Sequence, residues 1–189
     1  MSFSLKIGLM SRICLGTILA FMLSGCLAKN ANKLEYYEIG YDESSRNLIC
    51  DRRADRFVNL AYIKAQSGYD SRDIIIKNGT NISKMKDMKY IATPKDMLKK
   101  ALMLYMYNNC HVKFTSDATL QMGLNIIEMS LRDDIAFIQI AVELKDSDKM
   151  VLSDIITIEQ SYETNPINAL NMALNKALER IHSLVSSYR

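Results

Sequence analysis

The sequence predicts an α+β fold: a single domain whose antiparallel-rich, mixed β-sheet carries two main helices packed on one face. Three observations predict it. The segments 94–109 and 166–187 have helical spacing, are apolar along one side, and begin with Pro after a capping residue. Several segments between residues 57 and 160 alternate apolar and polar residues, which is typical of strands with one buried face. The strand expected over 135–144 has one cleanly apolar face that one-sided helices can cover.

Length and composition restrict the class of protein. The chain has 189 residues, with 24 Lys and Arg against 21 Asp and Glu, so its net charge is +3. This length suits one ordinary domain, and a hydrophobic content of 49% can fill a core and excludes a disordered chain. A charge so close to balance argues against a nucleic-acid binder, which would concentrate basic residues on one face.

The first 25 residues have the pattern of an export signal. Lys6 and Arg12 precede an apolar run of 11 residues, 13–23, which is too short to span a bilayer as a helix. The run ends in Leu23-Ser24-Gly25-Cys26, which looks like a bacterial lipobox, where the cysteine is lipidated and becomes the first mature residue. We therefore expect a signal peptide over 1–25, a tether over 26–33 and one globular domain over 34–189. A plain signal with a chance cysteine, or an uncleaved anchor, is the alternative.

Lipidation of Cys26 by palmitate-type chains would make the mature protein membrane-anchored. Removal of residues 1–25 leaves 164 residues with a net charge of +1. Two or more acyl chains hold a protein firmly at a membrane, so the domain itself needs no apolar anchor. Leu27 follows the cysteine where an Asp would favour retention in the inner membrane. We therefore expect a periplasm-facing location at the outer membrane.

Two of the four cysteines are candidates for a disulfide. Cys14 lies in the signal and Cys26 is the lipidation site, which leaves Cys50 and Cys110. An oxidising compartment permits a bridge between them, and a loop of this length would add about 3–4 kcal/mol by the chain-entropy estimate. Two buried free thiols are the open alternative, because sequence alone does not place the two Cα atoms.

The strands expected before the first helix are short. Residues 36–41 alternate Tyr37, Ile39 and Tyr41 with polar residues, and 57–64 and 72–77 have similar patterns. Asn78-Gly79 is a strong hairpin turn signal in which both residues accept a positive φ, so residues 80–85 are expected to return as the partner strand.

The strands expected after the first helix form the core of the sheet. Residues 120, 122, 124 and 126 are apolar and alternate with other residues, and after Ile126-Ile127 the apolar residues occupy the odd-numbered positions instead. This change of alternation predicts a β-bulge. Turns are expected at 132–134 and 145–149. The segment 150–160 is apolar on both sides, so it is predicted to be a central strand.

No residue pattern predicts a catalytic, cofactor or metal site. His111 and His182 lack a second metal-type pair, and Asp133-Asp134 are adjacent in an expected turn, where solvated charges are the simpler interpretation. Arg52 and Arg53 lie in a charged loop without a glycine-rich turn. Nucleophile-elbow, P-loop and dinucleotide-binding motifs are absent from the sequence. We therefore expect a protein that is not an enzyme and needs no cofactor.

The order of elements is similar to that of a known family. The features that carry the resemblance are the lipobox, the Tyr36-Tyr37 strand, the Tyr90-Ile91-Ala92-Thr93-Pro94 stretch before a Met97-Leu98 helix, and a closing helix with residues 169–174. Their order resembles that in the ABC-type transport auxiliary lipoproteins (PqiC-like). The resemblance covers residues 34–185, and what is shared is the class of residue at each position and no invariant motif. The chain departs from the family pattern at Tyr90, where Trp is usual, and lacks a proline-rich stretch before the second strand.

The resemblance implies an auxiliary component of an MCE-type phospholipid transport system. Its partners would be a periplasmic MCE-domain protein and the associated ABC transporter, docked at the outer membrane with several copies in a homo-oligomer. The contact is expected at a sheet edge, with 34–41 and 72–85 as the candidates. The alternative function is an assembly or pilotin-type lipoprotein of a secretion or surface structure, which would have the same anchor.

Overall fold

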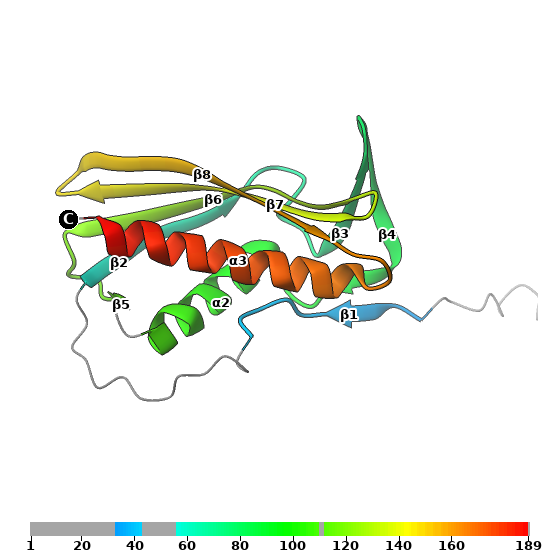
Figure 1. Ribbon diagram of the computed structural model, residues 1–189, viewed down its shortest axis with the longest axis horizontal. Coiled ribbons are helices and arrows are strands. Elements are labelled where there is room, and N and C mark those ends of the chain that lie inside the picture. Colours follow the sequence, from blue (N-terminus) through cyan, green and yellow to red (C-terminus); the bar gives the residue numbers. More distant parts are fainter. Residues whose placement is uncertain (1–32, 43–55, 110–111, 189) are drawn as a thin grey trace, which may run out of the picture. The chain divides into compact units, whose positions relative to one another are not determined.

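The computed structural model describes residues 33–42, 56–109 and 112–188, in which one mixed sheet of eight strands is accompanied by two helices (Figure 1). Residues from Leu34 onward belong to one compact unit. No described helix is long and apolar enough to cross a bilayer. The elements, in chain order, are β1 (Glu35–Tyr37), β2 (Arg56–Ala65), β3 (Asp73–Asn78), β4 (Asn81–Tyr90), α2 (Pro94–Asn109), β5 (Val112–Phe114), β6 (Leu120–Arg132), β7 (Ile135–Asp146), β8 (Lys149–Ser161) and α3 (Pro166–Ser187).

Strand β6 lies at the centre of the sheet. Its whole length pairs antiparallel with β7, which in turn pairs antiparallel with β8. On its other side, the first half of β6 pairs parallel with β2 and its last residues pair parallel with β3. The hairpin of β3 and β4 continues the sheet from there, and β1 joins β4 in parallel. This arrangement confirms the predicted antiparallel-rich, mixed sheet.

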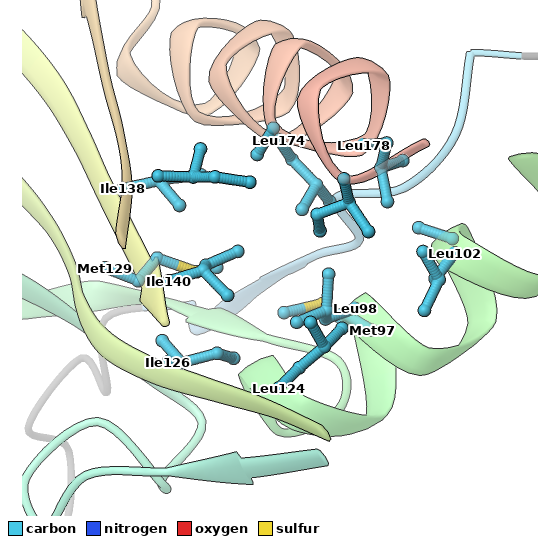
Figure 2. Close-up of a cluster of buried hydrophobic side chains, with 14 of the residues drawn as sticks. Met97, Leu98, Leu102, Leu124, Ile126, Met129, Ile138, Ile140, Leu174 and Leu178 are labelled. Carbon is cyan, nitrogen blue, oxygen red and sulfur yellow. The ribbon is translucent and has the colours of Figure 1, made fainter. Parts of the chain in front are cut away.

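Both helices pack on the same face of the sheet and enclose the core (Figure 1). Helix α3 lies against β7 and β8, and α2 lies against β2, β5 and β6. The apolar row of β7, from Ala136 to Leu144, faces the helices and is fully buried. Figure 2 shows side chains of the sheet and of both helices meeting in this core: Met97, Leu98, Leu102, Leu124, Ile126, Met129, Ile138, Ile140, Leu174 and Leu178.

The helices begin and end where the sequence predicts them. Asn165 caps α3, because its side chain accepts a hydrogen bond from the N–H of Asn168 at 2.9 Å, and Pro166 occupies the first turn. Thr93 and Pro94 use the same device at α2, where the Thr93 hydroxyl accepts from the N–H of Asp96. Local capping chemistry therefore sets both starts, and the bounds 94–109 and 166–187 are confirmed.

The predicted bulge in β6 is confirmed, and one hairpin turn differs in detail. The register of β6 against β7 shifts between Ile126 and Glu128, as the phase change requires. In the β3–β4 hairpin, Asn78 pairs with Asn81, so Gly79 and Thr80 form the turn. Gly79 has a φ of 60°, which favours glycine, whereas Asn78 remains a strand residue. The Asn-Gly signal located the hairpin but placed its turn one residue early.

Strand β8 is at the edge of the sheet, and its predicted central position is wrong. Among the strands that the structure describes, it pairs with β7 alone. One side of β8 faces α3, which explains the buried Ile156. The other side leaves Met150, Val151 and Ile155 exposed, with 56% of Ile155 accessible. The apolar residues on both sides of β8 therefore belong to one face that α3 covers and one face that is exposed.

The N-terminal strand and β5 are shorter or less regular than the sequence suggests. The predicted strand 36–41 is regular only as β1, since residues 38–41 leave the sheet and Ile39 enters the core. Strand β5 has three residues and was not predicted, because so short a segment shows no alternation. The predicted return strand 80–85 extends to Tyr90 as β4.

Candidate functional site

The segment after β1 is fixed to α3 by asparagine side chains. Asn171 Oδ1 accepts a hydrogen bond from the N–H of Gly40 at 2.8 Å, and Asn175 Oδ1 accepts from the N–H of Asp42 at 3.0 Å. Asn175 Nδ2 also donates to the Gly40 carbonyl at 2.9 Å. Ile39 is inserted into the core and is 1% exposed. We call Asn171 and Asn175 together with residues 39–42 the asparagine clamp. The two amide side chains satisfy the hydrogen-bonding groups of this irregular backbone, as a neighbouring strand would do in a sheet.

The same N-terminal segment is also held by the sheet and by α2. Strand β1 pairs with β4, and the N–H of Ile91 donates to the carbonyl of Tyr37 at 2.9 Å. Lys100 on α2 forms an ion pair with Glu38 at 2.6 Å. Residues 35–42 therefore have contacts with β4, α2 and α3, and the chain that leads back toward Cys26 is fixed to the body of the domain from residue 35.

Two shallow hollows flank the asparagine clamp. Their volumes are about 350 and about 320 Å³. Tyr41 and Tyr105 meet edge to face at 5.4 Å between ring centroids, and His182 continues the stack at 5.8 Å from Tyr105. Burial, with a smaller contribution from Glu179, raises the pKa of Tyr105, so its hydroxyl stays protonated at neutral pH. The polar lining consists of amides, carboxylates, tyrosines and a lysine, which suits hydrogen bonding to a segment of chain.

A third hollow lies between β8 and α3. Its volume is about 310 Å³, and it is lined by residues 154–157 of β8 and by Arg180, Ser183 and Leu184 of α3. The N–H of Ile155 donates to the adjacent Asp154 Oδ1 at 2.8 Å, so it takes no part in the ladder with β7. We call this region, together with the free edge of β8, the β8 groove. It combines unpaired strand backbone with a polar helix side.

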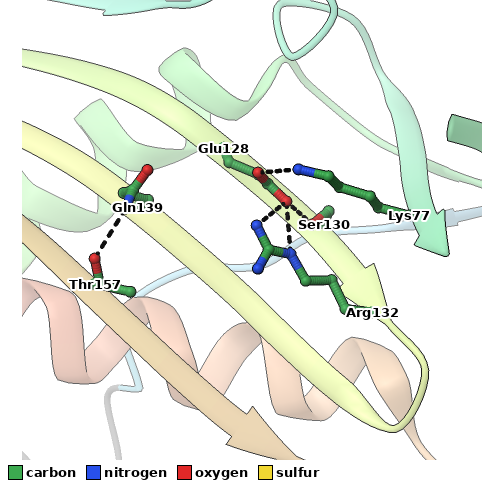
Figure 3. Close-up of polar contacts among 6 residues, drawn as sticks. All are labelled: Lys77, Glu128, Ser130, Arg132, Gln139 and Thr157. Atoms are coloured by element: carbon green, nitrogen blue, oxygen red, sulfur yellow. Dashed lines mark hydrogen bonds and ion pairs between the residues drawn. The ribbon is translucent and has the colours of Figure 1, made fainter. Parts of the chain in front are cut away.

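A buried polar cluster surrounds Glu128 at the place where β3 joins β6 (Figure 3). Lys77 Nζ lies 2.9 Å from Glu128 Oε2, while the Ser130 hydroxyl and Arg132 Nε donate to Oε1 at 2.6 and 2.9 Å. Burial opposes ionisation of Glu128, but these three hydrogen bonds outweigh it and lower its pKa. All carboxylate oxygens are thus engaged within the domain, which indicates a structural tie between strands.

Tyr62 crosses the sheet on the face opposite the helices. Its ring covers Gly123, where an added Cβ would lie 2.3 Å from the ring carbon Cζ. Its hydroxyl donates to Glu143 Oε2 on β7 at 2.8 Å, and Lys64 Nζ lies 4.6 Å from the ring centroid. The side chain thus links β2, β6 and β7, and Gly123 is the residue that allows the close approach.

The residues singled out in the sequence are only partly described by the structure. The lipidation site Cys26, the disulfide candidates Cys50 and Cys110, and His111 lie outside the described residues, as do Arg52 and Arg53. His182 lies on α3 in the aromatic stack. Asp133 and Asp134 form the β6–β7 turn, in which Asp133 has a φ of 49°. Among the described residues, no group of three or more His, Cys, Asp or Glu could hold a metal ion.

Neither the asparagine clamp nor the β8 groove is predicted by the sequence patterns. A usable signal for the clamp was present, since Asn171 and Asn175 are four residues apart and therefore share one face of an otherwise apolar helix. The signal for the β8 groove was the two-sided apolar character of β8, which was taken as evidence of a central strand. The proposed edge at 34–41 is occupied by β1, whose free side does lie at the sheet edge.

Comparison with solved structures finds the same fold in proteins of very different sequence. Protein XCC0632 from Xanthomonas campestris, of the family DUF330, matches with a TM-score of 0.64 and 12% identity, over 79% of this chain and 94% of that one. The hypothetical protein CT253 from Chlamydia trachomatis matches with a TM-score of 0.55 and 9% identity, over 71% of this chain and 98% of that one. These likenesses establish the fold.

A looser likeness links the chain to PelC from Paraburkholderia phytofirmans, which forms a dodecamer. Its TM-score is 0.37 and its identity 12%, over 67% of this chain and 88% of that one, which is too low to carry an inference. No family model matches the chain, and no curated protein matches it.

The comparisons contradict the predicted resemblance to ABC-type transport auxiliary lipoproteins. No model of that family matches, and a similar solved structure is a DUF330 protein. The resemblance rested on soft patterns of residue class, which many α+β lipoproteins of this element order would satisfy. The comparisons also give no support for lipid transport or for the MCE-domain and ABC partners.

Proposed function

We propose that the chain is a lipid-anchored, non-enzymatic assembly protein of a bacterial cell envelope, attached through Cys26 and facing the periplasm at the outer membrane. The asparagine clamp is the observation that carries this proposal. A lipoprotein whose domain only needs to stay near a membrane can be attached by a loose tether. Here the chain leading from the predicted anchor is instead bound by β4, α2 and α3 from residue 35 onward.

A fixed attachment has a mechanical use. Between Cys26 and residue 35 the chain can extend over at most about 30 Å, since each residue contributes at most about 3.3–3.6 Å. The domain is therefore held close to the membrane, and a force on it is transmitted through the clamp and the strand pairing. Such an attachment suits a protein that holds an envelope partner at a defined distance from the membrane.

The experiment measures whether the anchor determines where other envelope proteins reside. Cells would express the wild-type chain, or Cys26→Ala behind a cleavable plain signal, and membrane fractions would be compared by quantitative mass spectrometry. We expect at least one envelope protein to leave the outer-membrane fraction in the Cys26→Ala cells. That protein should also co-purify in stoichiometric amounts with the wild-type lipoprotein extracted in detergent.

A matched control is available within the signal itself. Cys14→Ala changes a cysteine that is removed with the signal peptide, so it should leave all fractions unchanged. If no envelope protein changes its fraction in the Cys26→Ala cells, although the variant is folded and exported, the assembly function is wrong.

A further inference from the structure

We propose that the β8 groove binds an extended segment of an envelope protein, with acidic side chains toward α3 and apolar side chains toward the outer side of the sheet. This inference rests on the proposed assembly function and names the surface and the chemistry of its partner. The bound segment would add a strand beside β8, in the manner of β-augmentation.

The free edge of β8 supplies the backbone hydrogen bonds. Because strand backbone groups alternate between the two edges, residues 153, 155, 157 and 159 direct their N–H and C=O groups away from β7. The bond from the Ile155 N–H to Asp154 Oδ1 agrees with this alternation. That carboxylate oxygen stands where the carbonyl of an added strand would accept. The edge is thus closed by a local side chain that an incoming segment can replace.

Helix α3 supplies the charge preference. Arg180 lines the groove and is exposed, and among the described residues no carboxylate lies within ion-pair distance of it. Lys176, one helical turn earlier, contacts the amide of Gln160 at 2.8 Å, which leaves its charge uncompensated. Two cations on the side of the helix next to the strand edge favour an acidic ligand over a neutral or basic one.

The outer side of the sheet supplies apolar contact. Val151 and Ile155 are exposed there, 37% and 56% respectively, beside Met150 at 49%. Side chains of an added strand alternate between the two faces, so one set would meet the cations of α3 and the other would cover these apolar residues. The groove therefore selects a segment in which acidic and apolar residues alternate.

A second copy of this chain is a less suitable occupant. The register of β8 shifts at Val151, and such a bulge twists an edge away from symmetric pairing. An antiparallel pairing of two β8 strands that sets Asp154 opposite Asp154 would also be disfavoured, because like charges directly opposite each other destabilise a sheet.

Photo-crosslinking in cells tests the inference on the intact lipoprotein. A photoreactive residue at Ser183, which lines the groove, would be activated, and the adduct mapped by mass spectrometry. We expect an adduct with an envelope protein at a stretch of alternating acidic and apolar residues. Ile155→Pro and Arg180→Glu should each lower its yield at least tenfold. The proline removes an N–H that faces the free edge, so the β7 ladder remains intact.

Three matched variants complete the design. Ile155→Val keeps the N–H, and Lys113→Glu reverses a charge on β5, at the other end of the sheet path, so both should leave the yield unchanged. Asp154→Ala removes the competing acceptor and a negative charge, so it should raise the yield. Circular dichroism and thermal unfolding would show that each variant is folded.

Several outcomes overturn the inference. These are an undiminished adduct in folded Ile155→Pro, an adduct between two copies of the chain, and no adduct at all. Because the fractionation experiment with Cys26→Ala does not involve the groove, it separates the two ideas. A partner that depends on the anchor but does not crosslink at Ser183 would leave the assembly function in place and refute the β8 groove as its contact.

Discussion

At the scale of single residues, Glu128 illustrates how a buried charge is retained. The residue is 7% exposed, and its carboxylate accepts from Lys77, Ser130 and Arg132. A carboxylate without such donors would be expelled from this position or protonated. With them it joins β3 to β6, which otherwise share only the short pairing at Ile75 and Ile76.

We predict that Glu128→Gln destabilises the domain by about 1–3 kcal/mol at neutral pH, because it leaves partly buried cations without their partner. The folded-state pKa of Glu128 lies below its ordinary value of 4.5. Its contribution is therefore fully present above the unfolded pKa and is lost as the pH falls through the folded pKa. Urea unfolding of both proteins between pH 7 and pH 3 should show the difference shrinking in the acid range.

The control for this prediction is Glu159→Gln, an exposed carboxylate on β8 whose change should have little effect at any pH. A difference between wild type and Glu128→Gln that stays constant from pH 7 to pH 3 would contradict the assigned role of the ionised form.

At the scale of elements, the sequence predicted best those features that depend on neighbouring residues alone. Asn165-Pro166 and Thr93-Pro94 located both helix starts, because capping depends on neighbouring residues alone. The phase change at Ile126-Ile127 located a bulge for the same reason. The order of strands could not be predicted in this way, since it depends on which distant segments pair.

The position of β8 shows the limit of periodicity. Apolar residues on both sides of a strand are consistent with a central strand, and equally with an edge strand that has one exposed apolar face. The asparagine clamp was missed for a related reason, because it joins residues more than 130 positions apart. The candidate site could therefore not be located from the sequence, although the residues that form it could be seen there.

We predict that Asn171→Ala combined with Asn175→Ala releases residues 39–42 from α3. The three lost hydrogen bonds contribute about 0.5–1.5 kcal/mol each, so the domain should lose roughly 1.5–4.5 kcal/mol of stability. Native-state hydrogen exchange at the amides of Gly40 and Asp42 should accelerate by at least tenfold.

Asn168→Ala provides the control, because this residue is exposed on the same helix and its side chain bonds to Met172 and not to residues 39–42 in the described structure. Exchange at Gly40 that is equally slow in the double variant would show that Ile39 and β1 hold the segment without the asparagines.

At the scale of the whole molecule, membrane attachment is predicted to depend on Cys26 alone. Cys26→Ala behind a cleavable plain signal should yield a folded periplasmic protein of 164 residues, since the described domain has its own apolar core between the sheet and the helices. Cell fractionation and circular dichroism would measure this. A folded variant that still sediments with membranes would show a second attachment surface.

The long-range contacts of the asparagine clamp impose an order on maturation. Gly40 and Asn171 are 131 positions apart, so the clamp itself cannot form before α3 is present, whereas the partners of residues 35–38 on β4 and α2 are available much earlier in the chain. Contacts of such large sequence separation also form late, because closing the loop costs entropy first. On the prediction that Cys26 is lipidated after export, acylation would precede closure of the clamp, which would then close on a chain that already carries its lipid.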